Sequence, residues 1–179
     1  MIAYAVTDPS TLDFNHLDSD LQRFSQKASM IVYRDKANAD YDVKAIDFVE
    51  VAKRLDFEKV LVHGDRILAE TVKADGVHLA STQLDTIPDA KARNLFVVVS
   101  THSLKEVQEA EALGADMVTF SPIFSTPNKG KAVGLEALKN IISEIKIPLI
   151  ALGGILTQEQ IRACQNAGAK GFASIRYFA

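Results

Sequence analysis

Short apolar runs alternate with helix-period segments along the whole chain, and this alternation constrains the fold more than any other feature. Eight runs, each rich in apolar or β-branched residues, lie at Ile2–Thr7, Met30–Tyr33, Lys59–His63, Gly76–Leu79, Leu95–Val99, Met117–Phe120, Pro148–Leu152 and Gly171–Ile175. Segments such as Leu104–Leu113, Leu135–Ile145 and Gln158–Ala167 have the apolar spacing of amphipathic helices. Strands that alternate with helices predict a parallel sheet, because parallel neighbours need a crossover between them.

Eight strands favour a compact (β/α)₈ barrel, formed by residues 1–179 as a single domain. The rival fold, an open doubly wound sheet, usually has five or six strands. Turns of similar composition precede three strands, at Lys73–Val77, Gly114–Val118 and Gly168–Phe172, as in a weak internal repeat. The sequence stops directly after the eighth run, so we expect the last helix of the barrel to be absent. An apolar face around Phe172 and Phe178 would then be uncovered, which predicts a homodimer.

Two features predict the helices in more detail. Within Asp42–Leu55, one face is expected to carry the apolar residues and the other the charged ones; the apolar set is Val43, Ile46, Val49 and Val51. Ser103 with Glu106, and Thr157 with Gln160, have the spacing of capping boxes that begin two further helices.

Composition narrows the function classes. Hydrophobic residues make up 47% of the chain, enough for one substantial core, and the net charge is −3 with no basic stripe and no Trp, which argues against a nucleic-acid partner. No apolar run approaches the roughly 20 residues that cross a bilayer, so no membrane partner is expected. Cys164 is the only cysteine, which excludes a disulfide within the chain. We therefore expect a soluble cytoplasmic protein.

In a barrel of this type, the loops after the strands carry the chemistry. Those loops would bring four cations to one mouth: Arg34, Lys36, Lys129 and Arg176. Hydroxyl groups from several loops would join them, and Gly153-Gly154 would let backbone N–H groups approach an oxyanion. The predicted ligand is a phosphate or a pyrophosphate. Each segment also has a plainer interpretation: a solvated loop for Arg34 and Lys36, a flexible surface loop for Lys129, and a tight turn for the glycines.

Three histidines lie near the predicted mouth. His63 ends a strand and could serve as an acid–base group, and so could His102, although its place directly before Ser103 suits a packing role equally well. His78 lies within a strand and is expected to line the barrel interior. No two histidines have the spacing of a zinc site.

Taken together, these segments resemble the thiamine phosphate synthase family and its relatives, the TenI-like thiazole tautomerases. The most specific match is Gly114-Ala-Asp116 followed by Ser121–Lys129. The other matching segments follow in order along the chain: Tyr4–Asp8, Val32–Lys36, Ala74–Leu79, Ser100–Ser103, Ala151–Ile155 and Gly168–Gly171. The resemblance covers nearly the whole chain.

The resemblance implies a substrate pair and a set of roles. In the synthase reaction a pyrimidine pyrophosphate loses pyrophosphate, and the nitrogen of a thiazole phosphate attacks the resulting cation-like carbon. Arg34, Lys36 and Lys129 would hold the pyrophosphate together with Mg²⁺, and Ser100 would lie nearby. Thr126, Gly153 and Gly154 would hold the thiazole phosphate. Asn128, Ile175 and Arg176 are further candidates for contacts with the same substrate.

The chain departs from the family pattern at several positions. Gly64 and Gln83 occupy the places of the two aspartates that hold magnesium, and Mg²⁺ binds weakly without carboxylates. Asp65 is one residue out of register. Arg176 replaces a serine that faces the phosphate, and its guanidinium would either bind the phosphate or fill its site. Val32 replaces a glutamine. Pro122 occupies the position of the catalytic histidine of the tautomerases, as it does in the synthases.

Three functions remain in view at this point. The first is the synthase reaction, with Mg²⁺ as cofactor. The second is a metal-free isomerase of the tautomerase type, which the missing carboxylates favour and Pro122 opposes. The third is a protein that binds phosphorylated thiamine precursors without turning them over.

Overall fold

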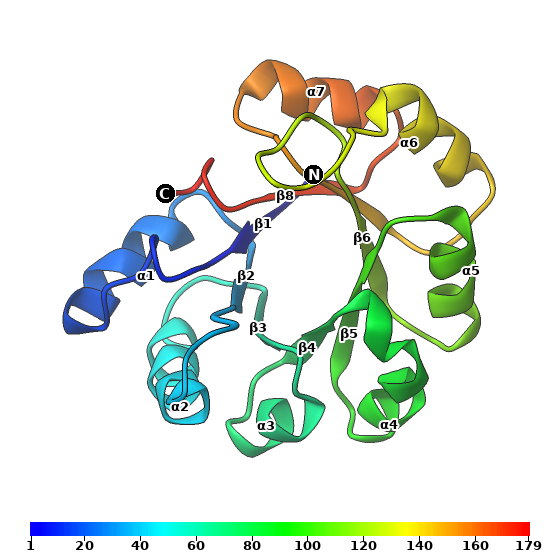
Figure 1. Cartoon of the computed structure of the whole chain (residues 1–179). Coiled ribbons are helices and arrows are strands. Elements are labelled where there is room, and N and C mark those ends of the chain that lie inside the picture. Colours follow the sequence, from blue (N-terminus) through cyan, green and yellow to red (C-terminus); the bar gives the residue numbers. More distant parts are fainter.

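The computed structural model describes all of residues 1–179 and confirms the predicted barrel. Eight parallel strands form a closed ring in chain order, and β8 pairs with β1 (Figure 1). The strands are β1 (Ile2–Val6), β2 (Met30–Tyr33), β3 (Lys59–His63), β4 (Gly76–Leu79), β5 (Phe96–Thr101), β6 (Met117–Phe120), β7 (Leu149–Leu152) and β8 (Gly171–Ser174). Every predicted strand is present, and no strand end differs from the prediction by more than two residues.

Helices surround the ring and link the strands (Figure 1). They are α1 (Leu17–Ser25), α2 (Tyr41–Ala52), α3 (Arg66–Thr71), α4 (Ile87–Ala92), α5 (Leu104–Ala112), α6 (Gly134–Ser143) and α7 (Gln158–Asn166); two 3₁₀ turns, η1 (Phe14–His16) and η2 (Ser81–Thr86), precede α1 and α4. None of these helices is long and apolar enough to cross a membrane.

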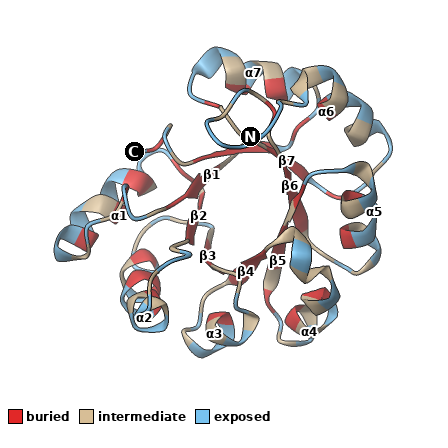
Figure 2. Ribbon diagram, in the orientation of Figure 1, coloured by how far each residue is buried: buried red, intermediate tan, exposed pale blue.

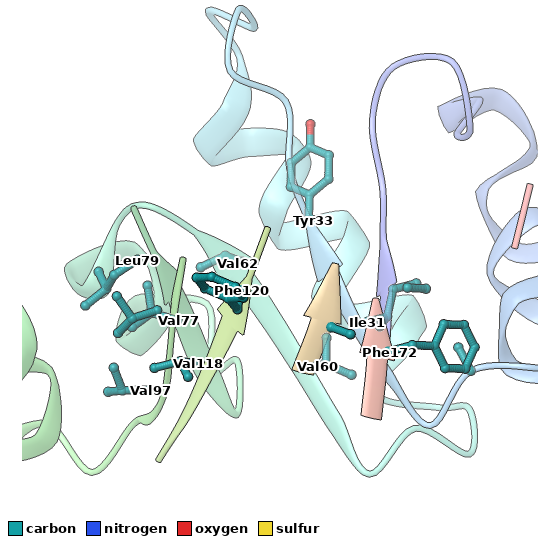
Figure 3. Packing of buried hydrophobic residues seen from close by; sticks show 14 of the residues in the cluster. Ile31, Tyr33, Val60, Val62, Val77, Leu79, Val97, Val118, Phe120 and Phe172 are labelled. Atoms are coloured by element: carbon teal, nitrogen blue, oxygen red, sulfur yellow. The ribbon is translucent and has the colours of Figure 1, made fainter. Parts of the chain in front are cut away.

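Alternating side chains divide the core into two layers. Inward-facing residues fill the barrel interior; they include Tyr4, Met30, Val32, Leu61, Val98 and Ile150. Outward-facing residues of the same strands pack beneath the helices, as Figure 3 shows for Ile31, Val60, Val77 and Phe120. Buried residues therefore follow the strands and the inner faces of the helices (Figure 2). This period-two pattern decides which residues near the strand ends can reach the mouth.

The buried face of α2 differs from the prediction. Ala45, Phe48 and Val49 are buried, whereas Val43 and Ile46 are about half exposed, at 58% and 51%. Phe48 decides the orientation of the helix, because its ring stacks on Tyr33 of β2 with 5.1 Å between the ring centroids. An aromatic ring buries more apolar area than a valine or an isoleucine.

The two predicted capping boxes also have different outcomes. The Thr157 box is confirmed, since Thr157 and Gln160 exchange hydrogen bonds between side chain and backbone. The box at Ser103 is only half formed. Ser103 Oγ accepts from Glu106 N, but the Glu106 carboxylate accepts from His102 N, one residue earlier than expected. Helix α5 begins where predicted, and the Glu106 carboxylate fixes the backbone of His102, the residue before the N-cap.

A short turn after β8, and not a helix, covers the sheet beside that strand. Phe178 stacks on Phe172 with 5.6 Å between the ring centroids, and Tyr177 meets both rings edge-on. The segment lies in the ring between α1 and α7 (Figure 1). Phe172 and Phe178 are only 5% and 1% exposed, so the expectation of an uncovered apolar face was wrong. A homodimer stays a prediction, but this face no longer supports it.

Candidate functional site

A cavity of about 450 Å³ lies at the carboxyl ends of the strands. It brings together most of the residues predicted from the sequence: Arg34, Lys36, His63, Ser100, His102, Thr126, Lys129, Gly153, Gly154, Ile175 and Arg176 all line it. Its other walls include His78, Ser81, Thr82, Ser121, Pro122 and Ser174. Its size suits a small molecule, and its position is the one at which (β/α)₈ barrels carry their active sites.

Four cations line the cavity and no carboxylate does. Arg34 and Lys36 come from the loop after β2, Lys129 from the loop after β6, and Arg176 from the turn after β8. Arg34 lowers the pKa of Lys36 more than any other group, with smaller contributions from burial and from Lys129. This coupling shows that the three side chains share one electrostatic environment. A ligand with several negative charges would relieve the repulsion between them.

His63 contributes a neutral imidazole to this cationic surface. Burial lowers its pKa to about 4, and Arg34 and Lys36 add to the shift by repelling a further positive charge. The ring lies 5.6 Å from that of His78, measured between centroids. At neutral pH His63 can therefore accept or donate a hydrogen bond, but it does not add to the positive charge of the mouth.

A chain of hydrogen bonds runs from the barrel interior to the cavity. Tyr4 Oη lies 2.8 Å from His78 Nδ1, and His78 Nε2 lies 2.9 Å from Ser100 Oγ. Tyr4 is fully buried, and burial lowers the pKa of His78 well below its usual range, so the imidazole is neutral. If Nδ1 carried the proton, the Tyr4 hydroxyl hydrogen would have no acceptor, because this is the only hydrogen bond of the hydroxyl. Tyr4 therefore donates to Nδ1, and Nε2–H donates to Ser100.

This direction of donation leaves the Ser100 hydroxyl proton free to point into the cavity. Ser100 is thus presented as a donor, which suits an anionic ligand. The sequence predicted that Ser100 and His78 would lie here but gave no role to Tyr4. The period-two alternation of β1, which places Tyr4 inward between Ile2 and Val6, is the signal that could have found it.

His102 has the packing role that was one of its two predicted roles, and its acid–base role stays a prediction. Its Nδ1 lies 3.0 Å from the carbonyl oxygen of Ser121, and because a carbonyl can only accept, Nδ1 carries the proton. The ring thus joins the loops after β5 and β6 and also lines the cavity.

Gly153 and Gly154 allow the loops after β6 and β7 to approach closely. Their φ angles are +105° and +69°. A Cβ on Gly153 would lie 2.7 Å from Pro122 Cα, and one on Gly154 would lie 2.6 Å from the Ser125 carbonyl oxygen. A side chain at either position would therefore force the loops apart. The peptide bond between Ser121 and Pro122, in the same contact, is cis.

Backbone donors collect on the side of the cavity formed by the loops after β7 and β8. The N–H groups of Gly153, Gly154, Ile175 and Arg176 donate to no acceptor within the chain. Four free donors beside a guanidinium make a favourable place for a phosphate, and the loops after strands 7 and 8 are where such barrels often bind one. The tight-turn and phosphate interpretations of Gly153-Gly154 are thus compatible.

The loop after β6 contains three predicted ligand residues, and not all of them reach the cavity. Thr126 and Lys129 line the cavity, but Asn128 does not. Asn128 has a φ of +61° and forms the turn that leads into Lys129. Asn128 therefore shapes this turn, and its ligand contact stays a prediction.

The residues at the expected magnesium positions do not fit that ion. Gly64 offers no side chain, and the Gln83 amide is hydrogen-bonded at both ends within the chain. Asp65 caps α3 by accepting from Ile67 N and Leu68 N. No group of three or more His, Cys, Asp or Glu side chains is placed to hold a metal ion. Gly64 and Gln83 therefore depart from the family's magnesium site in their hydrogen bonding as well as in their identity.

Fold and cavity together define a (β/α)₈ barrel protein with a mouth suited to phosphorylated small molecules. The profile of the family described as thiamine monophosphate synthase matches residues 3–178, and the chain belongs to that family.

Curated relatives match along nearly the whole chain. A putative thiamine-phosphate synthase 2 from Aquifex aeolicus is 34% identical over 98% of this chain and 96% of its own. A thiamine-phosphate synthase from Syntrophomonas wolfei is 35% identical over 96% of this chain and 85% of its own. The solved structure of thiamine phosphate pyrophosphorylase from Pyrococcus furiosus superposes with a TM-score of 0.82 at 29% identity, covering 97% of this chain and 85% of that one.

Proposed function

We propose that this protein catalyses a step of thiamine biosynthesis, in which a hydroxymethylpyrimidine pyrophosphate is joined to a thiazole phosphate with release of pyrophosphate. The observation that carries the proposal is the convergence of Arg34, Lys36 and Lys129 on a cavity without carboxylates. Family membership and relatives named thiamine-phosphate synthase support the same reaction.

The reaction breaks the bond between the pyrimidine methylene carbon and the pyrophosphate oxygen. The electron pair leaves with the pyrophosphate, and the lone pair of the thiazole nitrogen forms the new C–N bond. Negative charge therefore grows on the leaving group as the bond breaks. Arg34, Lys36 and Lys129 would stabilise that charge, and the Ser100 hydroxyl would donate to it. No proton transfer is needed, so the reaction does not require His63 or His102 as a base.

The second substrate would bind through its phosphate where the loops after β7 and β8 line the cavity. The free N–H groups of Gly153, Gly154, Ile175 and Arg176 would hold it, together with the Arg176 guanidinium and Thr126. Two neighbouring anion sites in one cavity would bring the thiazole nitrogen and the pyrimidine carbon together. Such positioning is a large part of the catalysis of a two-substrate reaction.

The two other functions considered are not favoured. A tautomerase would need an acid–base group in the loop after β6, and Pro122 offers none. Simple binding leaves unexplained why both a cluster of cations and a second phosphate site line one cavity.

Incubation of the purified protein with both substrates, followed by detection of thiamine phosphate, tests the proposal. We expect product, and we expect Lys36→Ala to lower the rate by about a hundredfold. Lys131→Ala is the matched control, because Lys131 is exposed and lies outside the cavity, and it should keep the wild-type rate. Thermal stabilisation by the substrates without product would contradict the proposal and indicate a binding protein. Isomerisation of the thiazole phosphate alone would indicate a tautomerase.

A further inference from the structure

The loops after β3 and β4 are joined by one side chain at the place where a synthase of this type would hold its metal. Gln83 Nε2 donates to the carbonyl oxygen of Gly64 at 2.8 Å, and Gln83 Oε1 accepts from Ala80 N at 2.9 Å. Gly64 N donates in turn to the carbonyl oxygen of His78 at 2.8 Å. The Gln83 side chain thus bonds the loop after β4 to the loop after β3, and the Gly64 backbone adds a bond from the loop after β3 to β4. The bond from Ala80 N fixes the Gln83 amide within its own loop.

The positions of Gly64 and Gln83 adjoin as a pair of ligands would. A Cβ built on Gly64 would have Gln83 Oε1 as its nearest neighbour, 4.0 Å away. Side chains at these two positions would therefore face each other across a short gap. The amide of Gln83 spans this gap, and both of its ends are engaged within the chain.

The charge of the cavity also opposes the binding of a divalent cation. Arg34, Lys36, Lys129 and Arg176 line it and no Asp or Glu does. Mg²⁺ and Mn²⁺ bind proteins through carboxylate oxygens, and a dication placed here would meet positive side chains without a negative one. A pyrophosphate, in contrast, would find its charge matched by side chains alone.

We infer that this site neutralises pyrophosphate with its own cations and holds no divalent metal, and that the Gln83 bridge keeps the loops after β3 and β4 together in place of a metal. The inference rests on the proposed function for the identity of the anion. Gln83 is a positioning residue in this scheme, since it contacts the loops and not the ligand.

Titration with Mn²⁺ alone, followed by the electron paramagnetic resonance signal of the free ion, tests the metal inference without reference to activity. The wild-type protein should leave Mn²⁺ free up to about 1 mM, whereas Gly64→Asp combined with Gln83→Asp should bind it with a Kd below about 1 mM. Gln83→Ala is the matched control, because it breaks the bridge without adding a carboxylate, and it should not bind. Wild-type binding below about 1 mM would overturn the inference. A folded double variant that leaves Mn²⁺ free would contradict the pairing of the two positions.

Formation of thiamine phosphate in EDTA and in excess Mg²⁺ provides the second arm. The wild-type rates in the two conditions should agree within about twofold. A loss of more than about tenfold in EDTA would overturn the inference, because magnesium accelerates the departure of a pyrophosphate where it takes part in the reaction. Absence of product in both conditions would refute the proposed function instead. The Mn²⁺ titration would still decide the metal inference in that case.

Discussion

Acid sensitivity of folding offers a direct test of the electrostatics of the mouth. His63 ends β3 beside Arg34 and Lys36, and burial together with these cations lowers its pKa to about 4. In the unfolded chain a histidine has a pKa of about 6.5. As the pH falls below 6.5, the unfolded chain takes up a proton that the folded chain accepts only near pH 4. The folded state therefore loses stability across that window.

The size of the loss follows from the two pKa values. The difference between them corresponds to about 3 kcal/mol once both states are protonated. Between pH 7 and pH 5 the His63 contribution to the free energy of unfolding should fall by about 2 kcal/mol. A bound pyrophosphate would offset the repulsion from Arg34 and Lys36 and reduce this loss, which links the measurement to the site.

Urea unfolding at pH 7 and pH 5 measures the effect. The wild-type protein should lose about 2 kcal/mol more than His63→Gln between the two pH values. His78 also resists protonation, but it is present in both proteins and largely cancels. His16→Gln is the matched control: Asp13 raises the pKa of His16, so that residue gives stability at low pH that is lost as the pH rises. An equal pH dependence in wild type and His63→Gln would refute the reasoning.

Three further changes test other parts of the site. Lys129→Ala should weaken pyrophosphate binding about tenfold in calorimetry, whereas Lys131→Ala should leave it unchanged; equal affinities would remove the loop after β6 from the anion site. Gly153→Ala should lower the free energy of unfolding by about 2 kcal/mol, because its φ is +105° and its Cβ would meet the neighbouring loop; a wild-type melting temperature would contradict this. Tyr4→Phe removes the donor that fixes the His78 tautomer, so the ¹⁵N chemical shifts of the His78 imidazole, measured by NMR, should depart from the Nε2–H pattern. An unchanged spectrum would contradict the assignment of the proton to Nε2.

Much of the fold could be predicted from the sequence because its signals are local. Period-two and apolar runs define all eight strands, and Thr157 with Gln160 marks the start of α7. The buried face of α2 could not be predicted in this way. The choice of Phe48 over Val43 depends on stacking with Tyr33, a contact with a different element.

The candidate site, too, could be predicted only in part from the sequence. Arg34, Lys36 and Lys129 were predicted because they follow strands, and parallel strands bring their carboxyl ends to one edge. The Gln83 bridge and the Tyr4–His78–Ser100 chain were not predicted, because each depends on side chains from different loops or strands meeting at hydrogen-bond distance. A sequence shows which residues reach the mouth, but not which of them bond to one another.

The turn after β8 has a consequence for how ligand binding and folding are linked. Ile175 and Arg176 line the cavity, while Tyr177 and Phe178, the next two residues, close the aromatic layer over Phe172. One tetrapeptide thus lines the cavity with its first two residues and covers the hydrophobic layer with its last two. Any ligand that orders the first pair also favours docking of the second, and loosening the aromatic rings weakens ligand affinity by the same free energy. The residues that complete the hydrophobic layer are thus continuous along the chain with residues that line the cavity.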